Sequence, residues 1–175
     1  MDAMDAKTAV SIIIPFYNGI DWLEMIFVAL GKQTFKDFEV IVADDGSRED
    51  VVARLEELTG KPVMRTITAA ERVGPERLFD VLLIAPCTGA TLARLATGLT
   101  DTAVTMAAKS HLRNGRPVVV AFSTNDALSG SAENIAALLN RKNYYFVPFG
   151  QDDPEGKPTS LQADFTRMGE AAEAA

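Results

Sequence analysis

Three short polar segments that could bind a small ligand each follow an apolar run of the sequence: residues 85–94, 123–134 and 148–158. The first stands at the expected start of a helix, where free backbone N–H groups suit an anion or the polar edge of a planar ring. Turns use the same residue types, so one segment alone would indicate a connection, whereas three on one sheet edge indicate a binding site. The candidate contacts are Thr88, Gly89, Thr91, Ser123, Thr124 and Asn125.

Residue counts exclude several kinds of catalysis. The sequence has one histidine, His111, and one cysteine, Cys87, so it offers neither a Ser-His-Asp apparatus nor a CxxC metal site. We expect His111, between Lys109 and Arg113 in a helical stretch, to be a surface or capping residue, and Cys87 to be a packing residue. Neither a GxGxxG after the first apolar run nor a GxxxxGK[ST] loop is present, so no catalytic residue and no metal ligand is predicted.

The composition limits the partners. A net charge of −7 and a pI near 4.7 argue against binding to nucleic acid or to acidic membranes. The first residues lack the pattern of a signal peptide, and no apolar run approaches the roughly 18 residues needed to cross a bilayer. We therefore expect a cytoplasmic protein with neither a nucleic-acid nor a membrane partner.

Apolar, β-branched runs alternate with amphipathic stretches along the chain. The runs predict strands at 10–16, 38–45, 79–85, 116–123 and 144–149, with a short edge strand at 62–67 as a sixth candidate. The stretches between them predict helices at 20–32, 48–59, 89–98, 102–114 and 131–141. After Asp164 the sequence predicts a further helix whose Ala/Glu-rich end, within 166–175, frays.

This alternation predicts one α/β domain over residues 1–175, with three αβα layers of the Rossmann or flavodoxin kind and a mostly parallel sheet of five or six strands. The strand order would be 3-2-1-4-5-6 if 62–67 forms a strand, and 2-1-3-4-5 if it does not. Either order places the three polar segments at the carboxyl edge of the sheet, where such folds bind ligands.

From about residue 54 to residue 165 the chain resembles the family of dipicolinate synthase B subunits, within the flavoprotein superfamily. The matching segments include DVLLIAPCTGATLARLATGL (80–99), TDTAVTMAAK (100–109) and FVPFGQDDP (146–154). The resemblance implies a homo-oligomer with FMN at the switch point of the sheet, its ring end lined by the six candidate contacts. It also implies a partner, the dipicolinate synthase A subunit, which binds NAD(P) and oxidises dihydrodipicolinate to dipicolinate during sporulation.

Residues 9–52 resemble instead the start of a family-two glycosyltransferase. In that family the Pro-x-Tyr-Asn loop and the Asp-Asp-Gly-Ser turn hold the uridine of a nucleotide sugar. The matching residues are Pro15, Tyr17, Asn18, Asp44, Asp45, Gly46 and Ser47, and the resemblance implies nucleotide contacts by Tyr17, Asn18, Asp44 and Asp45. A later Asp-x-Asp metal site and a catalytic-base segment are missing, which excludes glycosyl transfer.

The chain is therefore predicted to be a hybrid, recombined or engineered, of a glycosyltransferase-like segment (9–53) and a synthase-like segment (54–165). Phe16 and Tyr17 are bulky where a flavin phosphate would approach the backbone, and Asp44 and Asp45 would repel it. Ala90 stands where the resemblance implies an asparagine. Three hypotheses remain: an oxidoreductase subunit, incomplete as an enzyme, with an impaired FMN site; a chimeric domain without catalytic activity; and a uridine-nucleotide-binding module.

One helical stretch could also serve assembly. Residues 102–112 place small side chains on one face, which either packs on the sheet or meets another copy; these are Ala103, Met106, Ala107 and Ser110, with Val104 and Ala108 alongside. Gln151, Asp152 and Asp153 of the third polar segment are further interface candidates. The face and the resemblance together predict a homo-oligomer.

Overall fold

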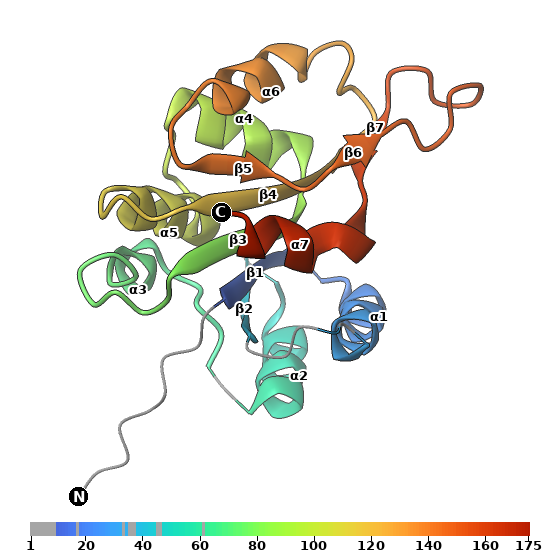
Figure 1. Cartoon of the computed structure of the whole chain (residues 1–175). Coiled ribbons are helices and arrows are strands. Elements are labelled where there is room, and N and C mark those ends of the chain that lie inside the picture. Colours follow the sequence, from blue (N-terminus) through green and yellow to red (C-terminus); the bar gives the residue numbers. More distant parts are fainter. Residues whose placement is uncertain (1–9, 17, 33, 35–37, 45–46, 61) are drawn as a thin grey trace, which may run out of the picture.

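The computed structural model describes residues 10–16, 18–32, 34, 38–44, 47–60 and 62–175 (Figure 1). The strands are β1 (Val10–Phe16), β2 (Phe38–Asp44), β3 (Val81–Cys87), β4 (Val118–Thr124), β5 (Tyr144–Phe146), β6 (Phe149–Gly150) and β7 (Leu161–Ala163). The helices are α1 (Ile20–Gly31), α2 (Glu49–Thr59), α3 (Ile67–Glu71), α4 (Gly89–Thr97), α5 (Ala103–Leu112), α6 (Ala132–Leu139) and α7 (Met168–Glu173), with a 3-10 helix, η1 (Phe165–Arg167). No helix within these ranges is long and apolar enough to cross a membrane.

The sheet is parallel over five strands in the order β2-β1-β3-β4-β5. This confirms the α/β fold class and the 2-1-3-4-5 order. Its far end is mixed, because the last residues of β4 pair antiparallel with β7, which in turn pairs with β6. The change of partner follows from the short β5: after Val147 donates to the carbonyl of Val120, the chain turns away at Pro148.

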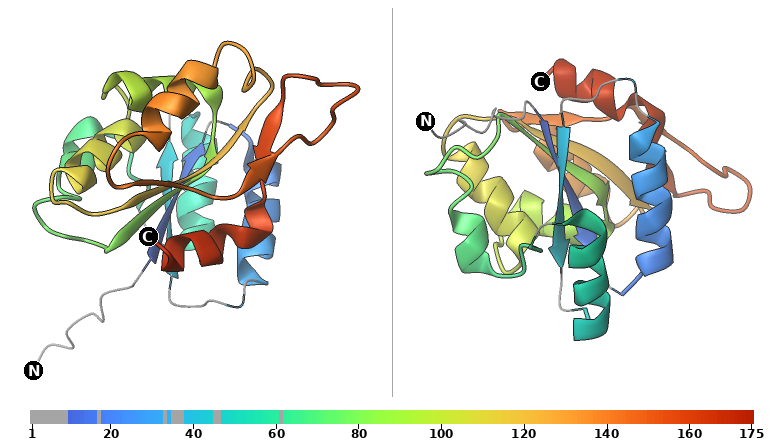
Figure 2. Two further views of the ribbon diagram at one scale, coloured as in Figure 1. Left: turned by 45° about the horizontal axis from the view of Figure 1, so that its top comes forward. Right: turned by 90° about the horizontal axis from the view of Figure 1, so that it is seen from below.

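Helices cover both faces of the sheet, as Figures 1 and 2 show. On one face α3, α4, α5 and α6 pack against alternate strand residues such as Leu82, Ile84 and Val120. On the other face α1, α2 and α7 pack against the intervening residues, among them Leu83 and Val119. Successive side chains of a strand point to opposite faces, so buried runs in β3 and β4 supply both cores and give the predicted three layers.

Local sequence sets the helix ends near the site. Thr88 caps α4 by accepting a hydrogen bond from the N–H of Thr91, and Thr102 and Thr105 form a reciprocal capping box at the start of α5. Gly98 ends α4 in the left-handed conformation (φ 76°), which glycine adopts without steric cost. These caps fix where the loops begin.

Two segments differ from the sequence prediction. Residues 62–67 form no strand beyond an isolated bridge at Met64, because Thr66 caps α3, which starts at Ile67. The helix predicted after Asp164 is present as η1 and α7, but its Ala/Glu-rich end, predicted to fray, stays helical to Glu173. Met168, Ala171 and Ala172 are buried there among the core residues beneath α1. Small apolar side chains let this last helix lie close against the sheet.

The two segments of the predicted hybrid share one sheet. β1, from the glycosyltransferase-like segment, pairs in parallel with β3, from Val10 opposite Val81 to Ile13 opposite Ile84. One core contains residues of both segments, including Ile14 and Leu23 from the first and Leu83 from the second. The chain therefore has a continuous core across the predicted junction.

Candidate functional site

Four of the six candidate contacts, Thr88, Gly89, Thr91 and Thr124, gather where β3 and β4 end. Thr88 directly follows β3 and Thr91 lies in the first turn of α4, while Thr124 is the last residue of β4. The side-chain oxygens of Thr88 and Thr91 are 3.2 Å apart. A Cβ atom on Gly89 would lie only 2.7 Å from Oγ1 of Thr124, so the two loops are in contact. The structure thus brings together both halves of the predicted ring-end site.

Asp126 holds this edge together. Its Oδ1 accepts a 2.6 Å hydrogen bond from Oγ1 of Thr124 and a 2.8 Å bond from Oγ of the buried Ser131. These two hydroxyl bonds lower the pKa of the Asp126 carboxyl. A Cβ on Gly89 would be 3.5 Å from the same oxygen, so the carboxylate lies at the N-terminus of α4, which favours negative charge. The small residues after β3 are needed because this neighbouring loop closes on their backbone.

Ser123 and Asn125 are placed differently from their neighbours. Ser123 precedes Thr124 in β4 and lies on the other face of the sheet, where it lines a cavity of about 270 Å³. The remaining lining is apolar: Ile12, Ile26, Leu30, Ala85, Pro86, Phe165 and Met168. Asn125 is exposed, and its carbonyl accepts a 2.7 Å bond from the hydroxyl of Thr159. The predicted contacts are therefore divided between the two faces.

The loops of the glycosyltransferase-like segment bind each other. The backbone N–H of Asn18 donates to Oγ of the buried Ser47 at 2.8 Å, and Oδ1 of Asn18 accepts from the N–H of Arg48 at 3.0 Å. Asn18 has a positive φ of 55°, which asparagine tolerates. Asp44 ends β2, but its side chain, Tyr17, Asp45 and Gly46 lie outside the described part of the chain. Asn18 and Ser47, which match the glycosyltransferase pattern and are described by the structure, therefore join two loops of the chain.

The third polar segment forms an arm between β6 and β7 that extends from the body (Figure 1). The amide of Gln151 donates to the carbonyl of Pro158 at 2.8 Å, and Asp153 accepts from the N–H of Gly156 at 2.9 Å. Asp152 lies 3.6 Å from Lys157. At the base of the arm, Phe149 packs against Phe122 with ring centroids 4.7 Å apart. The arm is thus ordered by its own contacts and anchored by an aromatic pair.

The two single-copy residues are both buried. Cys87 is fully buried in β3, and burial raises the pKa of its thiol, as the predicted packing role requires. His111 is also fully buried, so the predicted surface or capping role is wrong. Its ring packs on Phe79 with centroids 5.0 Å apart, and neither ring nitrogen has a side-chain or backbone partner in good geometry among the described residues. Burial and the charge of Arg116 lower the pKa of His111 to about 4.

The small-residue face of α5 is used within the chain. Ala103, Ala107 and Ser110 are buried, as are Val104 and Ala108, and only Met106 of the predicted face is half-buried. Oγ of Ser110 donates to the carbonyl of Glu71 at 2.7 Å and accepts from the N–H of Gly74, which ties α5 to α3. The expectation that this face meets another copy is therefore wrong, because α3 and the sheet cover it.

Sequence reasoning missed two features that the structure shows. The buried Ser131 orients Asp126, but its place at the start of a predicted helix suggested only a turn residue. Basic residues from α4, α5 and the turn before β5 gather at the opposite edge of the sheet, and their wide separation in sequence gave no signal.

Comparisons with known proteins agree with this architecture. The chain is 43% identical over 130 residues to the B subunit of dipicolinate synthase from Bacillus subtilis, an alignment that covers 74% of the chain and 65% of that protein. The crystal structure of the corresponding B subunit from Bacillus halodurans superposes with a TM-score of 0.75 at 33% identity, over 97% of this chain and 92% of that one. The chain belongs to the family of dipicolinate synthase B subunits. The Bacillus subtilis relative, however, is aligned over slightly less than two thirds of its length.

Two further matches concern the fold and the first segment. The FMN-dependent cysteine decarboxylase SpaF superposes with a TM-score of 0.64 at 19% identity over 97% of both chains, which shows a shared fold. The model of glycosyl transferase family 2 matches residues 11–79. An uncharacterized glycosyltransferase of Rickettsia bellii is 51% identical over 47 residues, 27% of this chain but 6% of that protein. Membership of the synthase family therefore coexists with a first segment similar to glycosyltransferases.

The described residues fit the two ends of FMN unequally. At the expected ring end, Asn125 is exposed, and the hydroxyls of Thr88 and Thr91 are bonded to each other at the start of α4. At the first loop, the N–H of Asn18 already donates to Ser47 and is not available to a phosphate. The α4 N-terminus cannot replace it, because Asp126 lies there. The described residues thus offer polar groups at the expected ring end and leave the Asn18 N–H and the α4 N-terminus unsuited to a phosphate.

Proposed function

We propose that this chain is the flavoprotein-like subunit of a two-subunit dipicolinate synthase, with a weakened FMN site. The observation that carries the proposal is the superposition on a solved relative of the same family over nearly the whole of both chains. The carboxyl edges of β3 and β4, with the candidate contacts, lie in the segment that resembles that family. A partner, the dipicolinate synthase A subunit with NAD(P), would complete the oxidation of dihydrodipicolinate to dipicolinate.

In this proposal the chain holds the flavin ring and leaves the phosphate in solvent. The ring would be oriented by the hydroxyl groups of Thr88 and Thr91 and by the amide of Asn125. The hydroxyl of Thr124 would stay bonded to Asp126 and would not contact the ring. Bound FMN supplies a two-electron redox centre. Its two hydroxyl donors keep the carboxylate of Asp126 ionised. Because this carboxylate lies at the α4 N-terminus, it would repel the phosphate of FMN there and would not repel the uncharged ring.

A fluorescence titration tests the cofactor. We expect the protein to quench FMN fluorescence, and riboflavin, which lacks the phosphate, to bind within a factor of about ten of FMN. Asn125→Ala, an exposed position, should weaken both flavins, while the matched change Asn140→Ala at the end of α6 should not. Free-flavin fluorescence unchanged by excess protein would contradict the FMN site.

Mixing with the NAD(P)-binding A subunit tests the partner. NAD(P)H formation from dihydrodipicolinate should increase when this chain is added to that partner. If FMN binds but this rate stays unchanged, the synthase role fails while the cofactor site stands.

Assembly belongs to the same proposal. Because the small-residue face of α5 is covered, the arm with Gln151, Asp152 and Asp153 remains the candidate interface for a homo-oligomer. Light scattering should then report at least twice the 18.9 kDa mass of the chain. A mass of one chain at all concentrations would contradict it.

A uridine-nucleotide-binding role is a second candidate, favoured by the family match over residues 11–79. The described loop residues Asn18 and Ser47 are bonded to each other, which leaves Tyr17, Asp44 and Asp45 as its candidate contacts. Calorimetric titration with uridine diphosphate should give a signal that Asp45→Ala abolishes. Absence of heat at millimolar ligand would leave a hybrid domain without this role.

A further inference from the structure

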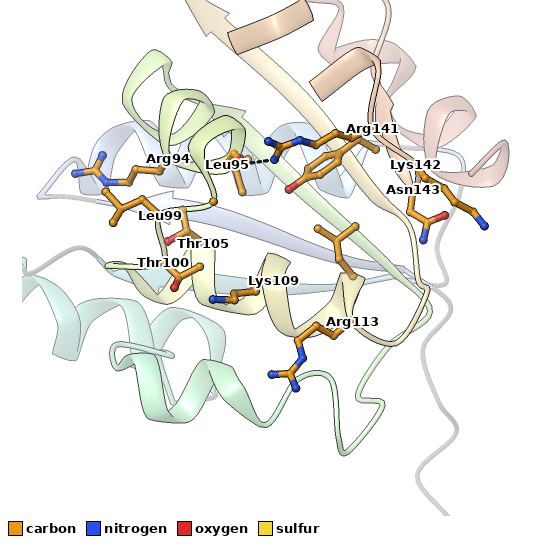
Figure 3. Close-up of a pocket in the computed structure, with 13 residues that line it drawn as sticks. Arg94, Leu95, Leu99, Thr100, Thr105, Lys109, Arg113, Arg141, Lys142 and Asn143 are labelled. Carbon is orange, nitrogen blue, oxygen red and sulfur yellow. Dashed lines mark hydrogen bonds between the residues drawn. The ribbon is translucent and has the colours of Figure 1, made fainter. Parts of the chain in front are cut away.

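A second cavity lies at the amino edge of the sheet, away from the flavin candidates. It is open to solvent, has a volume of about 470 Å³ and is bordered by the last turns of α4 and α5 and by the turn that leads into β5 (Figure 3). That turn is fixed to the sheet because the N–H of Val118, at the start of β4, donates to the carbonyl of Asn143 at 2.8 Å. The seven residues of β4 separate this cavity from Thr124 by roughly 20 Å.

The cavity is strongly basic although the chain carries a net charge of −7. Five cationic side chains line it: Arg94, Lys109, Arg113, Arg141 and Lys142. Arg94 is paired with Asp101 at 2.9 Å. None of the ion pairs within 4.0 Å among the described residues includes Lys109, Arg113 or Lys142. Much of the positive charge is therefore uncompensated by the protein.

Helix ends account for only part of this charge. Arg113 is the C-cap of α5, and Arg141 donates from Nη1 to the carbonyl of Leu95 at 3.0 Å and from Nη2 to that of Ala96, in the last turn of α4. A helix C-terminus carries about half a negative charge. Two such ends together with Asp101 balance fewer than half of the five cations. The hydrogen bonds also hold the Arg141 guanidinium in place beside the cavity.

The wall between these cations is apolar. Leu95 is buried, Leu112 and Tyr144 are half-buried, and Leu99 is 52% exposed. An exposed leucine beside unpaired cations offers contact area to the body of a ligand while the cations meet its charges. Small-molecule sites commonly combine an apolar lining with a few polar groups in a volume of roughly 300–1,000 Å³.

We propose that this cavity binds a small organic anion that carries at least two negatively charged groups on an apolar body. Lys109 and Arg113 bind one anionic group from the α5 side, and Arg141 binds another from the turn before β5. Leu95, Leu99 and Tyr144 contact the body. The site is independent of the flavin edge and of the proposed synthase activity.

NMR titration of the isotope-labelled, full-length protein tests the ligand class. Isophthalate, a benzene ring with two carboxylates, should shift the amide signals of Leu95, Leu112 and Tyr144, and its affinity should fall as salt screens the charges. Benzoate should bind about tenfold more weakly, and the uncharged isophthalamide should cause no shift. Equal shifts from benzoate and isophthalate, or isophthalate shifts confined to Thr88 and Thr124, would overturn the proposal.

Charge-removal variants test the residues. Lys109→Gln combined with Arg113→Gln should weaken isophthalate about tenfold, because two exposed cations without acidic partners are lost. The matched double variant Lys32→Gln with Arg77→Gln removes one lysine and one arginine from exposed positions outside the cavity and should bind as the unaltered protein does. Equal weakening in both variants would show a net-charge effect and overturn the site, and circular dichroism verifies that both fold.

Discussion

The loop after β3 shows how one glycine permits two loops to meet. Ala at position 89 would place its Cβ 2.7 Å from Oγ1 of Thr124. We expect Gly89→Ala to lower the free energy of unfolding by about 1–3 kcal/mol because Thr124 and Asp126 must move. The measurement is urea denaturation followed by circular dichroism.

A second variant distinguishes this contact from a general effect of alanine. Thr124→Ala removes the hydroxyl that Gly89→Ala would meet, so the two changes together should cost less than their sum, with a coupling of about 1 kcal/mol. Alanine also favours helix over glycine at the start of α4. If the changes in the free energy of unfolding for Gly89→Ala and Thr124→Ala simply add in the double variant, the contact with Thr124 is not what excludes a side chain at position 89.

His111 should make the stability of the fold depend on pH. Its pKa is about 4 when folded and near the ordinary 6.5 when unfolded, because burial beside Phe79 and the charge of Arg116 oppose protonation, while Asp80 and the backbone of Pro117 favour it. The unfolded chain therefore binds more protons between these values, and the free energy of unfolding should fall by about 2–3 kcal/mol as pH decreases from 7 to 4.

Replacing the ring isolates this contribution. His111→Leu keeps an apolar side chain at the site and should flatten the dependence on pH between 4 and 6.5. Urea denaturation at several pH values gives the comparison. Parallel curves for both proteins would assign the dependence to other groups.

At the scale of elements, the contact between α3 and α5 depends on Gly74. A Cβ there would lie 2.2 Å from the backbone oxygen of Ser110 and 2.5 Å from its hydroxyl. We expect Gly74→Ala to cost about 3 kcal/mol or more, since a backbone atom cannot turn aside. Gly31→Ala at the end of α1, where a Cβ meets nothing within 4 Å, is the matched control and should be near neutral. Equal thermal midpoints would contradict close packing of the two helices.

The elements were largely predictable, because β-branched runs and helical spacing are local signals. The runs at 116–123 and 79–85 became β4 and β3 with shifts of about two residues, since strand ends depend on partners. The strand predicted at 62–67 is absent because Thr66 caps a helix there, and this cap has more influence than the β-branched residues of the segment. The splitting of the last run into β5 and β6 depends on pairing with β7, which no local pattern records.

The candidate site was predictable in position more than in role. Parallel strands place their carboxyl ends together, and this brought Thr88 and Thr124 to one edge. Whether a hydroxyl is free or already bonded depends on contacts between distant loops, as with Asp126 and Ser131. The burial of His111 could not be predicted for a related reason. Its basic neighbours in sequence, Lys109 and Arg113, are exposed and indicated a surface position, while the His111 ring packs inside.

At the scale of the whole molecule, the pairing of β1 with β3 predicts that the hybrid unfolds as one unit. Trp22, the single tryptophan, lies in α1 of the first segment, so its fluorescence reports on that segment, while far-UV circular dichroism reports on the whole chain. The two signals should give the same urea midpoint, because one core contains residues of both segments. Separate midpoints would show that the segments fold independently.

The burial of α7 has a consequence for folding during synthesis. Met168, Ala171 and Ala172 complete the core that also contains Ile12 and Val119, yet the ribosome makes them after every strand of the sheet. Until they emerge, the nascent chain presents part of an apolar sheet face to its surroundings, a state open to chaperones and to aggregation. A ribosome that stalls shortly before residue 168 would therefore hold a nascent chain with a nearly complete sheet and an uncovered face, so the yield of folded protein depends on the synthesis of α7.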